Sequence, residues 1–112
     1  METIPQRLSR YINPGKVFIF STSNCPYCTQ AKKLLSSFEI KYSSVEVDTE
    51  LRSDKDFINT LKTHSKIDTY PKIYIGIKCI GGYTDLNKLS SNMKLFSMLK
   101  AEGVRFADDD QI

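Results

Sequence analysis

Hydrophobic residues follow two different spacings in the first third of the chain. Residues 16–21 form an almost uninterrupted apolar run rich in Val, Phe and Ile, which is typical of a strand buried on both faces of a sheet. Over residues 26–38 the apolar positions recur at helical spacing with lysines on the other side, which predicts an amphipathic helix. A shorter helical pattern over residues 4–12 ends before Pro14-Gly15. The chain is therefore predicted to begin with a helix, a strand and a helix.

Weaker patterns predict a second strand and a third helix. Residues 41–47 alternate weakly between polar and apolar positions and predict a strand that ends at Asp48. Ser53 and Asp56 then resemble a capping box, and apolar residues within 57–61 indicate the helix that follows. Because a strand–helix–strand unit has a right-handed crossover, we expect the first two strands to be parallel.

A hairpin follows. Residues 70–75 predict a third strand, with Pro71 at its entrance, where a missing N–H does least damage. Residues 77–80 come too soon after Gly76 for a crossover helix, so they are predicted to pair antiparallel with the third strand.

Two helices complete the predicted fold. Thr84 and Asp85 can cap the first of them, and the second begins at about residue 92 and stops at Gly103. The element order predicts an α/β domain in which helices cover both faces of a mixed four-stranded sheet.

Composition supports one domain over residues 1–107, followed by a short acidic tail, 108–112, that we expect to be frayed. The 112 residues are 40% hydrophobic, which suits a single core. The formal charge of +3 is modest, and no basic run interleaved with aromatics argues for nucleic acid. The start lacks the apolar core of a signal peptide, and no run could span a bilayer. We expect a cytoplasmic monomer without membrane association.

Cys25 and Cys28 lie where the first strand passes into the second helix. An odd total of three cysteines does not suit a disulfide-stapled secreted scaffold, and in a reducing compartment a close pair is more often catalytic or metal-binding than structural. Free backbone N–H groups and the helix dipole stabilise a thiolate at a helix start. Cys25 is therefore predicted to be a nucleophile, and Cys28, one turn further, to resolve a mixed disulfide.

A metal site is the rival interpretation. Cys25, Cys28, His64 and Cys79 nominally supply three thiolates and an imidazole. Zinc sites usually bring their ligands as two close pairs, whereas His64 and Cys79 are far apart in sequence. We therefore expect no metal, with His64 an ordinary surface residue and Cys79 a small apolar strand residue.

Three motifs occur in order along the chain: Cys25-Pro26-Tyr27-Cys28, Thr69-Tyr70-Pro71 and Gly81-Gly82-Tyr83-Thr84-Asp85-Leu86. Together they resemble the dithiol glutaredoxins, over nearly the whole chain from the first helix to about Gly103. The resemblance implies the thioredoxin fold, which agrees with the element order predicted from spacing.

The resemblance also implies residue roles. Cys25 would attack and Cys28 would resolve, with Pro71 as a cis-proline opposite the thiols. The backbone of Tyr70 would pair with the cysteine of glutathione. A helix start would take the carboxylate of the γ-glutamyl end, and a side-chain carboxylate its ammonium. The glutathione-binding residues implied in this way are Tyr27, Thr69, Tyr70, Pro71, Gly82, Thr84 and Asp85.

The sequence departs from the family pattern near the expected glutathione carboxylate. Thr22 stands where many glutaredoxins have a lysine, and Asp68 where a basic or amide residue is common. Tyr70 replaces the usual valine. These changes weaken the expectation of tight glutathione binding unless Lys66 or Lys72 compensates.

The resemblance implies a glutathione-dependent thiol–disulfide oxidoreductase that acts on protein disulfides and protein–glutathione mixed disulfides. Glutathione would be its reductant, and disulfide-bearing or glutathionylated proteins its partners. Two alternatives stay open: a redoxin reduced by a thioredoxin-type reductase, and a non-enzymatic iron–sulfur or zinc carrier.

Overall fold

One four-stranded sheet forms the centre of the structure. The computed structural model describes residues 2–107. Its strands are β1 Val17–Ser21, β2 Ser43–Glu46, β3 Lys72–Ile75 and β4 Lys78–Gly81. They lie in the order β2-β1-β3-β4, with β1 parallel to β2 and β3 antiparallel to both β1 and β4. The predicted mixed sheet, parallel crossover and hairpin are confirmed.

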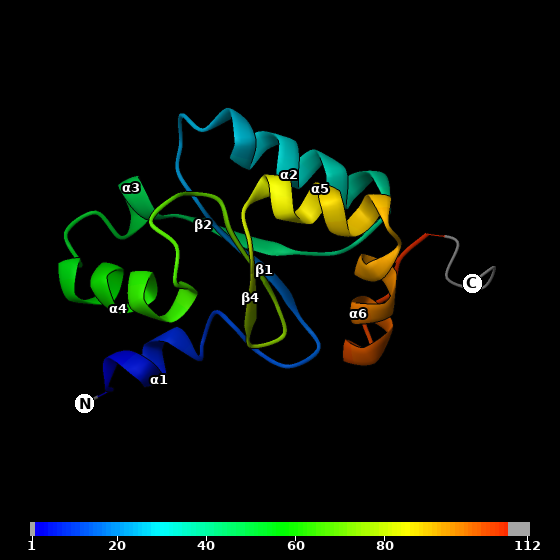
Figure 1. Cartoon of the computed structure of the whole chain (residues 1–112). Helices are drawn as coiled ribbons and strands as arrows, with labels where there is room; N and C mark the ends of the chain where they lie inside the picture. The colour runs from blue at the N-terminus through cyan, green and yellow to red at the C-terminus, as the bar shows by residue number, and fades with distance from the viewer. Residues whose placement is uncertain (1, 108–112) are drawn as a thin grey trace.

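Helices cover both faces of this sheet. They are α1 Ile4–Leu8, α2 Pro26–Ser37, α3 Val47–Glu50, α4 Lys55–Ser65, α5 Tyr83–Ser91 and α6 Lys94–Glu102. In Figure 1, α2 and α5 run together on one side of the sheet, while α1 and α4 lie together on the other. The helix α6 packs with α2 and α5.

The central strand β1 supplies side chains to both cores. All five of its residues are buried, as its uninterrupted apolar run predicts. Val17 and Ile19 pack with residues of α2, α5 and α6. Phe18 and Phe20 pack on the opposite face with residues of α1 and α4. This burial fixes the end of β1, and therefore the start of α2, in a rigid framework.

Two predicted element boundaries are wrong, and one helix is unpredicted. The first helix ends at Leu8 rather than near residue 12, because Arg10 and Tyr11 donate their backbone N–H groups three residues back in tight turns. The second strand ends at Glu46, and the unpredicted short helix α3 follows at once. The backbone N–H of Glu46 donates to the Glu50 carboxylate at 2.7 Å, which stabilises this turn.

The capping predictions are also corrected. The helix α4 begins at Lys55 with Asp54 at the N-cap, so Ser53 and Asp56 do not form the predicted capping box. The Asp54 carboxylate forms an ion pair with Arg7 of α1 instead. The helix α5 begins one residue earlier than Thr84, with Gly82 at its N-cap.

No helix within residues 2–107 is long and apolar enough to cross a membrane. The predicted acidic tail, 108–112, lies outside the described residues.

Candidate active site

Cys25 is the N-cap residue of α2, at the point where the chain leaves the central strand. Pro26 occupies the first helical position, where its fixed φ suits the helix and its missing N–H leaves no bond unmade. The backbone N–H of Cys28 donates to the Cys25 Sγ at 3.1 Å. The helix start therefore presents its donor groups and its dipole to this sulfur, an arrangement that stabilises negative charge there.

Cys28 is one turn further into α2 and only 2% exposed. Burial, and secondarily the hydrogen bond with Cys25, raise the pKa of the Cys28 thiol to about 12. At neutral pH this thiol keeps its proton. The two sulfurs therefore differ in solvent access, and the Cys25 sulfur is the one that accepts an N–H of the helix start.

The Tyr70–Pro71 peptide bond is cis, as the resemblance implies. It places the Tyr70 carbonyl oxygen 3.6 Å from the Cys25 Sγ, which acts as the donor. The segment before β3 thus lies directly over the reactive end of α2.

Lys72 contacts the segment before β3, residues 67–70, from the buried side. Its side chain is 1% exposed, and its ammonium donates to the Ile67 carbonyl oxygen. The same ammonium lies 4.8 Å from the centre of the Tyr70 ring, within the range of a cation–π contact. Burial lowers the pKa of Lys72. Because the ammonium is buried, Lys72 does not provide the exposed positive charge that could compensate for Thr22 and Asp68.

Lys66 and Asp68, the other charged residues near the expected glutathione carboxylate, lie at the surface. Lys66 is exposed at the left-handed C-cap of α4, so its predicted compensating role stays a prediction. Asp68 pairs with Lys62 at 3.4 Å, but both side chains are mostly exposed. Such a pair is screened by solvent and offsets the Asp68 charge only in part.

The glycine motif meets the proline motif behind the thiols. A side chain at Gly82 would approach the Pro71 carbonyl oxygen to 3.5 Å, so the two segments are in contact. Gly81 has a φ of +114°, and a side chain there would collide with the Asp85 carboxylate. That carboxylate accepts the Gly82 N–H at 3.0 Å and so closes the first turn of α5.

Tyr27 and Tyr83 join the cysteine motif to the glycine motif. Their rings stack with centres 6.1 Å apart and an angle of 29° between their planes. Tyr27 is 62% exposed, so much of its ring faces solvent beside the thiols. Tyr83 was not among the predicted site residues. Its position directly after two glycines, at the start of a helix, is the sequence feature that could have indicated a residue of the site.

The structure brings all three sequence motifs to one place. Cys25 contacts the Tyr70 carbonyl, Gly82 lies against Pro71, and Tyr27 stacks on Tyr83. Thr69, Thr84 and Asp85 are exposed within these same segments. The arrangement is a surface site with one accessible sulfur, one buried thiol and a peptide edge beside them.

Comparisons with known proteins agree with this geometry. A family model described as Glutaredoxin matches residues 17–80. The chain belongs to the glutaredoxin family. It is 37% identical over 94 residues to Glutaredoxin-1 of Homo sapiens, an alignment that covers 82% of this chain and 89% of that protein. It is 39% identical over 93 residues to a glutaredoxin of Ricinus communis, with coverage of 82% and 89%.

Solved structures give the same family and fold. A buckwheat glutaredoxin in complex with glutathione superposes with a TM-score of 0.78 at 32% identity, covering 89% of this chain and 90% of that chain. The predicted thioredoxin fold is therefore confirmed. Glutaredoxins are thiol–disulfide oxidoreductases, and the predicted enzyme class is confirmed with the family.

A residue missed by sequence reasoning holds the loop before the thiols of this glutaredoxin. Asp48, on the short helix α3, accepts the Ser23 N–H at 3.0 Å and the Ser23 hydroxyl at 2.6 Å. The hydrogen bond from the Ser23 side chain is the main cause that lowers the pKa of Asp48. Sequence patterns gave no sign of this contact because the two residues are brought together only by the β1–β2 pairing.

A second missed contact ties α2 to the edge of the sheet. The buried Ser21 hydroxyl donates to the Glu46 carboxylate at 2.6 Å, and Lys32 of α2 donates to the same carboxylate at 2.9 Å. The Ser21 bond first, and then Lys32 against the cost of burial, lower the pKa of Glu46. The segment that contains Glu46 and Asp48 therefore holds both the loop before α2 and the middle of that helix.

The nominal metal ligands are not assembled. The Nδ1 of His64 lies 2.8 Å from the Tyr74 hydroxyl, and Cys79 belongs to β4. Within residues 2–107, no three or more His, Cys, Asp or Glu side chains are grouped as a metal site would require.

Proposed function

We propose that Cys25 carries out the first chemical step and that glutathione is the reductant of this glutaredoxin. The observation that carries the proposal is the asymmetry of the two sulfurs. The Cys25 Sγ receives a helix N-terminal N–H at 3.1 Å, whereas burial raises the pKa of Cys28 to about 12. The thiolate is the attacking species in disulfide exchange, so Cys25 rather than Cys28 makes the first attack on the substrate.

Glutathionylated proteins need only Cys25. Its thiolate attacks the sulfur of the glutathionyl group, forms the Cys25–glutathione disulfide and releases the protein thiolate, which takes a proton from water. A second glutathione thiolate then attacks the glutathionyl sulfur of that disulfide. This step yields glutathione disulfide and restores the Cys25 thiolate.

Protein disulfides require Cys28 as well. Attack by Cys25 on one sulfur of the substrate gives a mixed disulfide and a substrate thiolate. Cys28 then attacks the Cys25 sulfur, its proton passing to a departing substrate thiolate, and the products are the reduced substrate and a Cys25–Cys28 disulfide. Two glutathione molecules reduce this disulfide and leave as glutathione disulfide.

The surface beside the thiols suits glutathione in three places. The segment formed by the exposed Thr69 and the half-buried Tyr70 offers a backbone peptide group to the cysteine moiety, as when an extended peptide adds to a strand. The first turn of α5, which follows Gly82 and includes Thr84, offers backbone N–H donors to the γ-glutamyl carboxylate. The exposed Asp85 carboxylate can pair with the ammonium. The exposed Tyr27 ring borders this surface, whereas the Pro71 side chain is buried beneath it, and the buckwheat relative solved with glutathione supports this use of the fold.

Two substitutions test the division of labour. Cys25→Ser should abolish turnover of both a glutathionylated peptide and a protein disulfide. Cys28→Ser should keep deglutathionylation and lose reduction of the protein disulfide. Equal losses of both activities in Cys28→Ser would contradict the proposal. Cys79→Ser is the matched control, because it removes the remaining thiol without touching either sulfur.

The electron donor is tested separately. Supply of glutathione with its reductase should sustain turnover, and a thioredoxin-type reductase without glutathione should not. The reverse result would identify a redoxin that is reduced by a thioredoxin-type reductase. The absence of a lysine at Thr22 and the negative charge of Asp68 would then explain why glutathione does not serve as the reductant.

A further inference from the structure

A large concave pocket lies at the end of the sheet that is distant from the thiols. It is lined by the start of β1, by the segment between α2 and β2, and by the segment after α6, and encloses about 880 Å³. This volume is within the range of about 300–1,000 Å³ that is typical of ligand sites. Because Val17 begins β1 and Cys25 follows its other end, no residue of the pocket belongs to the active site.

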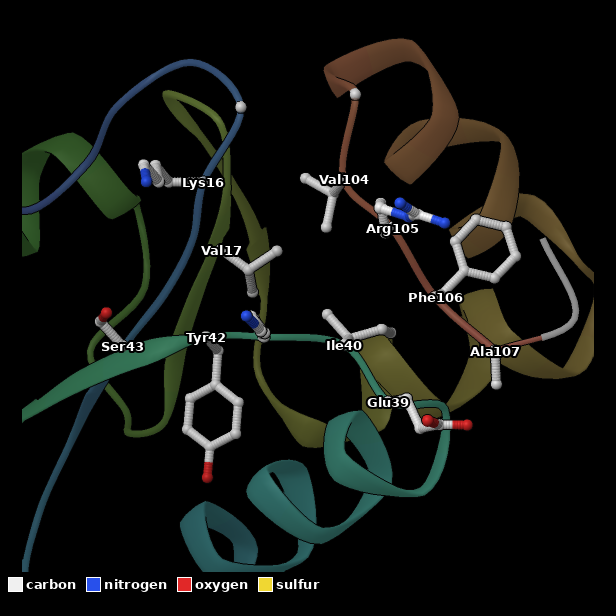
Figure 2. Close-up of a pocket in the computed structure, with 13 residues that line it drawn as sticks. Lys16, Val17, Glu39, Ile40, Tyr42, Ser43, Val104, Arg105, Phe106 and Ala107 are labelled. Carbon is white, nitrogen blue, oxygen red and sulfur yellow. The ribbon is translucent and has the colours of Figure 1, made fainter.

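The pocket has an apolar floor. Figure 2 shows the side chains of Val17, Ile40, Val104 and Phe106 around the hollow. Val17, Ile40 and Phe106 are also members of the core on this side of the sheet. Because these three side chains belong to the packed core, each offers only a small, rigid apolar patch to a ligand, beside the half-buried Val104.

The rim is cationic. Lys16, Lys41 and Arg105 line the pocket and are exposed, and Figure 2 shows Lys16 and Arg105 on different walls. Within residues 2–107 none of the three takes part in an ion pair. Among the lining residues within 2–107, Glu39 is the one that carries a carboxylate, so this described part of the rim has more positive than negative side chains. The nearby Glu102 carboxylate accepts the Gly15 N–H at 2.9 Å and adds a second negative charge close to the rim.

One wall also offers backbone donors. Residues 104–106 follow the end of α6 without regular secondary structure. Among the hydrogen bonds found within residues 2–107, none uses the backbone N–H of Arg105 or of Phe106. Free N–H groups along an extended segment can pair with the carbonyl groups of an added peptide.

We propose that this pocket is a docking site for a short, extended, acidic segment of a partner protein that also carries an apolar side chain. Carboxylates of the segment would pair with Lys16, Lys41 and Arg105, its apolar side chain would lie on the floor, and its carbonyl groups would accept the free N–H donors. The site would hold a partner protein at a distance from the thiols, which leaves the reactive end of α2 open for exchange.

The chain itself contains a rival occupant. Residues 108–110 are three aspartates that directly follow the pocket residue Ala107. Their charge would suit the same rim, so the experiment must separate binding in trans from occupancy by this tail.

The test is a titration of the full-length, 15N-labelled protein with a blocked hexapeptide of alternating glutamate and leucine. We expect amide shifts at residues 16–17, 40–43 and 104–107, and weaker binding as salt is raised. The variant Lys41→Glu/Arg105→Glu should raise the dissociation constant about tenfold or more, because two attractions become repulsions. The variant Lys33→Glu on the exposed face of α2 is the matched control and should bind like the wild type.

Several results would overturn the proposal. These are the absence of shifts at millimolar peptide, shifts confined to the active site, equal binding by the double variant, or equal binding of a lysine–leucine hexapeptide. Binding that requires the triple variant Asp108→Asn/Asp109→Asn/Asp110→Asn would identify the tail as the occupant and would also overturn it. Since the peptide contains no cysteine, its binding is measured independently of the redox activity.

Discussion

Replacing Lys72 by methionine tests how the segment over the thiols is held. The side chain is 1% exposed, donates to the Ile67 carbonyl and faces the Tyr70 ring at 4.8 Å. A hydrogen bond from a charged group contributes about 1.5–3 kcal/mol. A desolvated cation–π contact contributes about 2 kcal/mol. Against these gains stands the cost of burying an ammonium, which is several kcal/mol in real proteins.

The lost hydrogen bond and cation–π contact are offset by the avoided cost of burying an ammonium, so Lys72→Met should change the global stability only slightly. Methionine has a similar volume, and the Ile67 carbonyl keeps a second donor in the Ser65 hydroxyl at 3.2 Å. No buried acceptor is therefore left without a partner. We expect Lys72→Met to change the free energy of unfolding by less than about 2 kcal/mol. Urea unfolding measures this directly.

The effect on the active site should be larger than the effect on stability. Without the ammonium, the Tyr70 ring and its segment lose an anchor of about 1–2 kcal/mol, which corresponds to about tenfold or more in kcat/KM for a glutathionylated peptide. Alkylation of Cys25 should not slow, because the Tyr70 carbonyl accepts only from the protonated thiol. Lys72→Arg keeps a cation and donors and should recover part of the loss. An unchanged kcat/KM in Lys72→Met, or equal losses in both variants, would refute this reasoning.

Three further predictions concern ionisation, the active-site loop and the glycine turn. Because the pKa of Cys28 is raised to about 12, its contribution to stability is complete below pH 9 and is lost as pH rises toward 12. Urea unfolding of the reduced protein should show this loss, and Cys28→Ser should show less of it. Asp48→Ala removes the acceptor that holds the loop before the thiols and should lower kcat/KM severalfold, with the folded amide spectrum preserved. Gly81→Ala places a side chain at a φ of +114° against Asp85 and should destabilise the protein by about 1–2 kcal/mol or more in urea unfolding. A loss below about 0.5 kcal/mol would contradict the steric argument.

Much of the fold could be predicted because its signals are local. The run at residues 16–21 is buried on both faces in β1, so no polar alternation is needed. The short gap at Gly76 leaves room only for a hairpin, and Gly103 ends α6 in the left-handed conformation. The predicted position of Cys25 at the start of a helix follows from Pro26, which suits the first helical turn and little else nearby.

What could not be predicted depends on contacts between distant segments. The capping box at Ser53 failed because Asp54 takes the N-cap position and pairs with Arg7 in α1. The short helix α3 carries Asp48, which accepts a hydrogen bond from Ser23. The two residues follow the neighbouring strands β2 and β1, so only the pairing of these strands brings them together. Charge counting alone could not show that Lys72 points inward, since that depends on the register of β3 in the sheet.

The roles of the predicted glutathione-binding residues stay predictions, as do the monomeric state and the cytoplasmic location. The sequence places these residues in three motifs, and the structure brings the motifs together. Which of their atoms contact glutathione is decided by binding measurements on variants of Tyr27, Thr84 and Asp85.

Mass analysis of the Cys28→Ser protein after incubation with glutathione disulfide tests the central claim most directly. We expect one glutathionyl group per chain, located at Cys25 by peptide mapping and removed by reduced glutathione. Cys79 provides an internal control, because it is a second free thiol with a pKa raised mainly by burial. A glutathionyl group at Cys79 instead of Cys25, or none on the protein, would contradict the assignment of Cys25 as the nucleophile.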